Sequence, residues 1–106
     1  MWTMSNPTFE QEKARLAALP RAERFEELIA FPCEHTFKVI AAPEGLEQRV
    51  RDALATRGQP TPHISRRTSS NGRWLSLSVT VQVASGVELD QLYAALEGLR
   101  GLKMLV

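Results

Sequence analysis

The chain has 106 residues, of which 43% are hydrophobic and 24% are charged, and its formal net charge is +1. This length suits one domain, and this composition is typical of a globular protein. A net charge so close to zero does not by itself indicate a nucleic-acid or membrane partner. The single cysteine, Cys33, excludes an internal disulfide and a cysteine-based zinc site, and we expect no metal and no cofactor.

The sequence also lacks the marks of a membrane protein. No apolar run approaches the ~18 residues that a spanning helix needs. Residues 1–20 have no apolar centre of the kind that a signal peptide carries. We therefore expect a cytoplasmic protein without a membrane partner.

Two short helices are predicted near the N-terminus. Residues 1–7 read as a loose end, and Thr8 with Gln11 forms a possible capping box for a helix over 9–19. A second helix is predicted over 21–30.

Phe25, Leu28 and Ile29 share one side of this second helix, and Phe31-Pro32 ends it. We predict that residues 1–24 are an N-terminal extension, flexible or partly helical. Residues 25–106 then form a single domain.

The domain opens with a strand over 35–41 and a helix after it. Pro43 suits the first position of this helix, where a missing N–H is harmless. Apolar residues follow at helical spacing from Leu46, and Gly58 predicts a left-handed end.

The clearest strand runs over 73–83. Its leucines and valines alternate with Trp74, serines and a threonine, so one face is suited to a core and the other is small and polar. Asn71-Gly72 before it is a strong hairpin signal and predicts pairing with 63–69, between residues whose numbers sum to 143. This register sets Arg66 opposite Leu77, so either that end projects beyond the helices or the loop is longer than two residues.

A last helix and strand complete the chain. Ser85 and Glu88 form a capping box before an amphipathic helix. Residues 102–106 read as a strand with Leu102, Met104 and Val106 on one side.

The order of elements is strand, helix, strand, strand, helix, strand. With right-handed crossovers it predicts an α+β, ferredoxin-like βαββαβ sheet of order 4-1-3-2. Both helices cover one face. The open face is expected to carry Lys38, Trp74, Ser76, Ser78, Thr80 and Lys103.

Several motifs resemble the YbeD-like family of small bacterial proteins. Phe31-Pro32-Cys33 and Phe37-Lys38-Val39-Ile40 resemble its "YPC…KVMG" opening, and residues 70–81 are similar to its "SxGxYxSVSxT" strand. Leu92-Tyr93 and the terminal residues 102–106 match its last helix and its end.

The resemblance implies a fold similar to ACT regulatory domains, which bind amino acids and pair into dimers. No biochemical activity of the family is implied. Ala41 departs from it by standing where the family usually has glycine, at a turn that an ACT-type ligand approaches closely.

The sequence offers no convincing catalytic set. Cys33, Glu34 and His35 are adjacent, but neighbouring residues of an extended chain point apart. An acylphosphatase needs an arginine in the loop after the first strand, and Ala41 to Gly45 contains none. We expect that the protein is not an enzyme and has no catalytic residues.

Two binding surfaces follow from this topology. The first is the open face, with Lys38, Trp74, Ser76 and Ser78 as candidate contacts for a protein partner or a small metabolite. Trp74 either anchors an interface or packs over its own hairpin. A homodimer through the sheet is a further option.

The second surface is a basic one. Residues 49–73 hold six arginines and one acid, which suggests nucleic-acid binding through Arg49, Arg66, Arg67 and Arg73. This function is the alternative to a regulatory or binding module of ACT-like fold. A single aromatic on the open face makes a poor base-stacking platform, so we expect no nucleic-acid partner.

Overall fold

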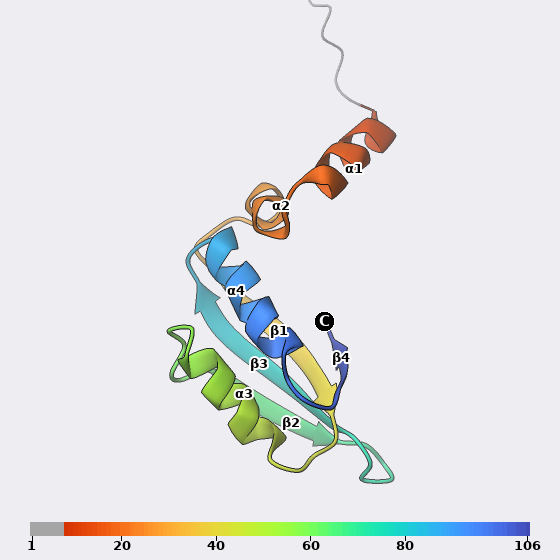
Figure 1. Cartoon of the computed structure of the whole chain (residues 1–106), viewed down its shortest axis with the longest axis vertical. Helices are drawn as coiled ribbons and strands as arrows, with labels where there is room; N and C mark the ends of the chain where they lie inside the picture. The colour runs from red at the N-terminus through yellow and green to blue at the C-terminus, as the bar shows by residue number, and fades with distance from the viewer. Residues whose placement is uncertain (1–7) are drawn as a thin grey trace, which may run out of the picture.

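The structure, a computed structural model, describes residues 8–106. The loose end predicted for residues 1–7 lies outside them. Eight elements follow one another along the described chain (Figure 1). In order they are α1 (Phe9–Ala18), α2 (Arg21–Leu28), β1 (Cys33–Ala41), α3 (Leu46–Ala55), β2 (His63–Thr68), β3 (Leu75–Val83), α4 (Gly86–Glu97) and β4 (Leu102–Leu105).

The four strands form one antiparallel sheet of order β2-β3-β1-β4. This is the predicted ferredoxin-like order. In Figure 1, α3 and α4 lie across one face of the sheet. The other face carries neither helix, because both crossovers run on the same side.

The alternation of β3 determines the core. Leu75, Leu77, Val79, Val81 and Val83 are buried, whereas Ser76, Ser78 and Thr80 stay partly exposed. The predicted inward and outward faces of this strand are therefore confirmed. The other core side chains come from β1, α3 and α4: Phe37, Val39, Ala41, Leu46, Val50, Leu54, Leu89, Leu92 and Leu96.

The hairpin has the predicted register and a different turn. β2 and β3 pair from His63↔Thr80 to Thr68↔Leu75, so paired numbers sum to 143. The Gly72 amide donates to the Ser69 carbonyl at 2.9 Å, and Gly72 alone in this loop has a positive φ, 71°. A two-residue turn needs positive φ at Asn71 as well, so that turn was wrong and the loop is longer.

The extra length leaves Arg66 opposite Leu77, as the register requires. Its guanidinium lies on the helix side of the sheet, where Nη1 is 3.5 Å from the Glu47 carboxylate of α3. Because Arg66 is exposed and pairs with Glu47, its charge stays solvated although the opposite residue, Leu77, is apolar.

The start of α3 differs from the prediction. Pro43 is not its first residue, because the helix begins at Leu46 after an N-cap at Gly45 with φ 65°. A left-handed residue cannot continue a helix backwards, so the turn at Gly45 separates Pro43 from α3. The predicted left-handed Gly58 is confirmed, with φ 83°.

The face assigned to β4 was wrong. The strand pairs Ile40 with Met104 but Ala41 with Leu102, so Lys103 is an extra, bulged residue. The bulge turns Leu102 and Leu105 toward the core. Met104 and Val106 instead remain 48% and 64% exposed.

The two N-terminal helices behave differently. α1 has the predicted capping box between Thr8 and Gln11, and none of its residues is buried. α2 packs against α4, with Phe25 and Ile29 on the core, whereas Leu28 is 66% exposed and was wrongly expected on the same side. The predicted boundary between residues 24 and 25 falls inside α2.

Candidate ligand site on the open sheet face

The uncovered face of the sheet, called the open face below, is built by the outward residues of β1 and β3. Lys38 lies opposite Ser78 and Ile40 lies opposite Ser76. The Lys38 backbone also exchanges hydrogen bonds with Val106, at 3.1 and 3.0 Å. Three of the predicted contacts, Lys38, Ser76 and Ser78, therefore lie next to one another.

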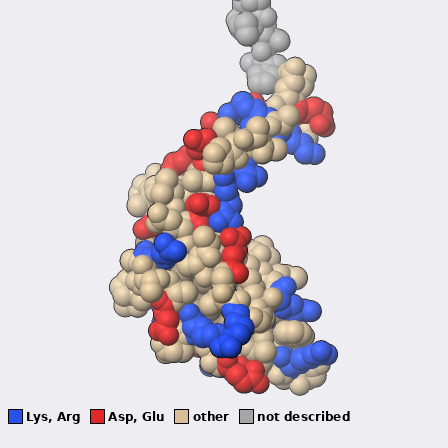
Figure 2. Space-filling view, viewed as in Figure 1, with Lys and Arg blue, Asp and Glu red and all other residues tan. Residues whose placement is uncertain are grey.

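The four arginines of the predicted basic patch do not form one cluster, because only Arg67 and Arg73 lie beside Trp74. Arg49 donates to the backbone carbonyls of Glu44 and Arg100, at 2.7 and 3.5 Å. Arg66 lies on the helix side, and Arg67, one residue further along β2, points to the open face. On the side shown in Figure 2, basic and acidic side chains are interspersed.

A hollow of about 320 Å³ lies on the open face near the hairpin. Strand residues of β1 and β3 form part of it, and Trp74 stands immediately before β3. The bulged Lys103 reaches it from β4. The lining residues are Ile40, Arg67, Thr68, Ser69, Trp74, Ser76 and Lys103.

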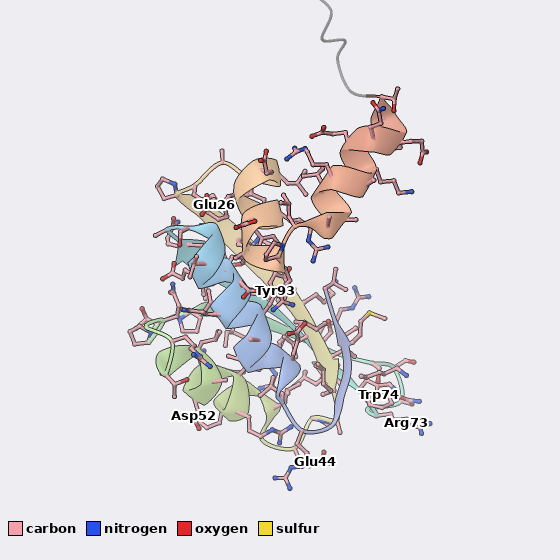
Figure 3. All side chains as sticks on the ribbon, turned by 45° about the horizontal axis from the view of Figure 1, so that its top comes forward. Glu26, Glu44, Asp52, Arg73, Trp74 and Tyr93 are labelled. Atoms are coloured by element: carbon pink, nitrogen blue, oxygen red, sulfur yellow. The ribbon has the colours of Figure 1, made fainter. Side chains whose placement is uncertain are left out.

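Trp74 is half-buried and flanked by two cations. Lys103 Nζ lies 4.6 Å from the centre of its ring, and Arg73 Cζ lies 5.5 Å from it. The Trp74 amide donates to Ser69 Oγ at 3.0 Å, which ties the residue to its own hairpin. Figure 3 shows Arg73 and Trp74 at the hairpin end, away from Tyr93 and Glu26. Trp74 therefore both packs on its hairpin and lines the hollow.

Within the described part of the chain, the cations of the open face form no ion pair with a carboxylate. Among residues 8–106, the ion pairs use Arg15, Arg21, Arg51 and Arg66 as their cations. Lys38, Arg67, Arg73 and Lys103 take part in none of them. The lining of the hollow also contains no carboxylate, so its charge is uncompensated and favours an anion.

His35, the histidine next to Cys33 and Glu34, does not lie on the open face. His35 faces the helix side, and its Nε2 is 3.1 Å from the Tyr93 hydroxyl of α4. Burial lowers the pKa of His35, and burial raises the pKa of Tyr93. Phe25 stacks on Tyr93, which makes this a packed aromatic cluster.

Residues 8–106 contain no group of three or more His, Cys, Asp or Glu side chains arranged to hold a metal ion. None of their helices has the length and apolar character required to cross a bilayer.

Several lining residues were not among the predicted contacts. Lys103 was expected on the open face, but nothing in the sequence linked it, or Ile40 of β1, to Trp74. In the structure Lys103 is the bulged residue of β4, and its ammonium lies over the indole. Ser69 follows Thr68 at the end of β2 and reaches the hollow because its amide donates to the Trp74 carbonyl at 2.9 Å.

The sheet order and the uncovered face define a small ferredoxin-like α+β domain. The solution structure of protein HP0495 from H. pylori has the same fold, with a TM-score of 0.63 at 20% identity, covering 74% of this chain and 85% of that chain. At this identity the likeness concerns the fold alone.

The chain belongs to the family described as "Protein of unknown function (DUF493)", whose profile matches residues 26–106. It is 35% identical over 81 residues to the UPF0250 protein IL0958 of Idiomarina loihiensis, covering 76% of this chain and 92% of that protein. It is also 35% identical over 74 residues to the UPF0250 protein NE1487 of Nitrosomonas europaea, covering 67% and 85%. The YbeD-like resemblance is thereby confirmed, and α1 with most of α2 precedes the matched region.

Proposed function

We propose that this protein is a non-enzymatic binding module, ACT-like in fold, that receives a small metabolite or a protein partner on its open face. The observation that carries the proposal is the uncovered sheet around Trp74. Arg67, Arg73 and Lys103 lie beside Trp74, Lys38 lies further along the same face, and none of the four has an ion-pair partner within the described residues.

Physical chemistry supports a binding role for such a surface. A hollow with an apolar floor and a few convergent polar groups is the usual form of a ligand site. Aromatic and arginine side chains are enriched at binding hot spots, and Trp74 stands here beside Arg73. Exposed Met104 and Val106 extend the apolar area along β4.

The absence of catalysis is part of the proposal. The hollow is lined by seven residues, and they include no histidine, cysteine or carboxylate to act as a general base. The serine hydroxyl of Ser69 is held by Asn71 Oδ1 at 2.9 Å. His35 is engaged with Tyr93 on the other side of the sheet.

An NMR titration tests the proposed function. The ¹⁵N-labelled full chain is mixed separately with the low-mass filtrate and with the protein fraction of an extract from its native host. We expect one fraction to shift or broaden the amides of Lys38, Ser76 and Ser78. Changes confined to α3 and α4, or no change with either fraction, would contradict the proposal. A cytoplasmic setting belongs to the same proposal, and fractionation of host cells tests it.

A further inference from the structure

We infer that the hollow beside Trp74 binds a small organic acid, with the acid group between Arg67 and Lys103 and a compact apolar body against Ile40 and Trp74. This inference rests on the proposed function and names the class of its ligand. The lining residues carry it through their size, charge and polar groups.

The hollow has the dimensions of a small-molecule site. Its volume of about 320 Å³ is at the lower end of the usual range for such pockets, roughly 300–1,000 Å³. Outward residues of two paired strands, Ile40 and Ser76, provide a flat floor. The half-buried indole of Trp74 provides a rigid apolar wall.

The positive charge of the lining favours an anionic ligand. Arg67 and Lys103 both line the hollow, and no carboxylate does. A guanidinium can hold a carboxylate or a phosphate through two parallel hydrogen bonds. The Lys103 ammonium, 4.6 Å from the centre of the indole ring, would keep its cation–π contact while it pairs with the acid group.

The polar groups of the lining restrict the ligand further. Ser69 Oγ already accepts from the Trp74 amide and donates to Asn71 Oδ1. The hydroxyl of Ser76, which faces outward opposite Ile40, remains as a neutral donor of the lining. One hydroxyl and two cations suit a single acid group better than an extended polar ligand.

A titration of the full ¹⁵N-labelled chain tests the inference with three probes: 2-naphthoate, its uncharged analogue 2-naphthamide, and inorganic phosphate. We expect 2-naphthoate to shift the Trp74 indole N–H and the Ser76 amide. Naphthamide and phosphate should bind about tenfold more weakly or worse, because each lacks one half of the ligand. Equal binding of naphthoate and naphthamide, or of naphthoate and phosphate, would overturn the inference.

Variants locate the site within the same experiment. Lys103→Gln and Arg67→Gln should each weaken 2-naphthoate about tenfold, because each removes one charge partner. Lys13→Gln on the exposed surface of α1 is the matched control and should leave binding unchanged. Unchanged affinity in both the Lys103 and Arg67 variants would refute the site, and Arg67, being exposed, leaves a folded variant to measure.

The two proposals fail in different ways. If host extract perturbs Lys38 and Ser78 while 2-naphthoate does not bind, the open face is functional and the organic-acid inference is wrong. If neither host extract nor any probe perturbs the open face, both are wrong.

Discussion

One glycine at the contact between α2 and α4 allows a prediction of whether a substitution raises or lowers the free energy of unfolding. Gly86 is buried at the first position of α4, and its amide donates to Glu26 Oε1 of α2 at 2.6 Å. A Cβ at this position would lie 2.3 Å from the Ala22 carbonyl oxygen and 2.9 Å from Glu26 Cγ. The first of these atoms belongs to the backbone, so α2 must move to admit a methyl group.

Gly86→Ala should therefore destabilise the protein. Overpacking of this kind costs about 1–3 kcal/mol. In a helix without the clash, the same change would stabilise by about 0.5–1 kcal/mol, because alanine loses less backbone entropy than glycine. The steric term outweighs the propensity term, so we expect a net loss of free energy of unfolding and a loosened α2.

Gly98→Ala is the matched control. Gly98 ends the same helix with φ −81°, and its added Cβ would make ordinary contacts of 3.6 Å or more. Urea unfolding of the two variants and hydrogen exchange of the α2 amides measure the effects. We expect lower stability and faster exchange in Gly86→Ala alone. A Gly86→Ala chain as stable as the Gly98→Ala chain, with protected α2 amides, would refute the packing described here.

Three further predictions concern pH, charge and nucleic acid. Burial holds the pKa of His35 below its ordinary value of 6.5, so the unfolded chain binds the proton first and the free energy of unfolding should fall as the pH drops below about 6.5. In urea unfolding from pH 7 to pH 5, His35→Gln should lose less stability than His63→Gln. Equal losses in the two variants would contradict this. Arg21→Gln removes half-exposed ion pairs to Asp90 and Glu97, so we expect a loss below about 1 kcal/mol that shrinks in salt, and a loss unaffected by salt would count against it. Fluorescence anisotropy with a labelled single-stranded RNA should show no binding at low salt, and tight binding that weakens steeply with salt would favour the nucleic-acid alternative.

The core strands were predictable because apolar and polar residues alternate strictly along them. Leu75 to Val83 alternates without exception, and every inward residue is buried. The hairpin register followed from the position of Asn71-Gly72 even though the turn type did not. A register depends on the side-chain faces of both strands, whereas a turn type depends on φ angles that several loop lengths can satisfy.

The candidate site was harder to predict because it depends on a bulge. Strict parity sent Met104 and Val106 inward, and the extra residue at Lys103 reversed both. Nothing in the local sequence marks this bulge, which is defined by the pairing of β4 with the distant strand β1. The contact between Lys103 and Trp74 therefore follows from strand pairing that only the structure shows.

The docking of α2 was unpredictable for a similar reason. The partners of Glu26 and Arg21 are Gly86, Asp90 and Glu97, which lie far along the chain in α4. The helical pattern of α2 indicated Leu28 as an inward residue, but the angle at which α2 meets α4 leaves it 66% exposed.

The most direct test of the central claim, that the open face is the binding surface, is site-specific photo-cross-linking in the native host. A benzophenone amino acid replaces Lys38, which is exposed on the open face, or Gln91, which is exposed on α4. Intact mass spectrometry of the purified chain then detects adducts of either a small molecule or a protein. We predict adducts at position 38 and none at position 91. Adducts at position 91 with none at position 38 would contradict the account.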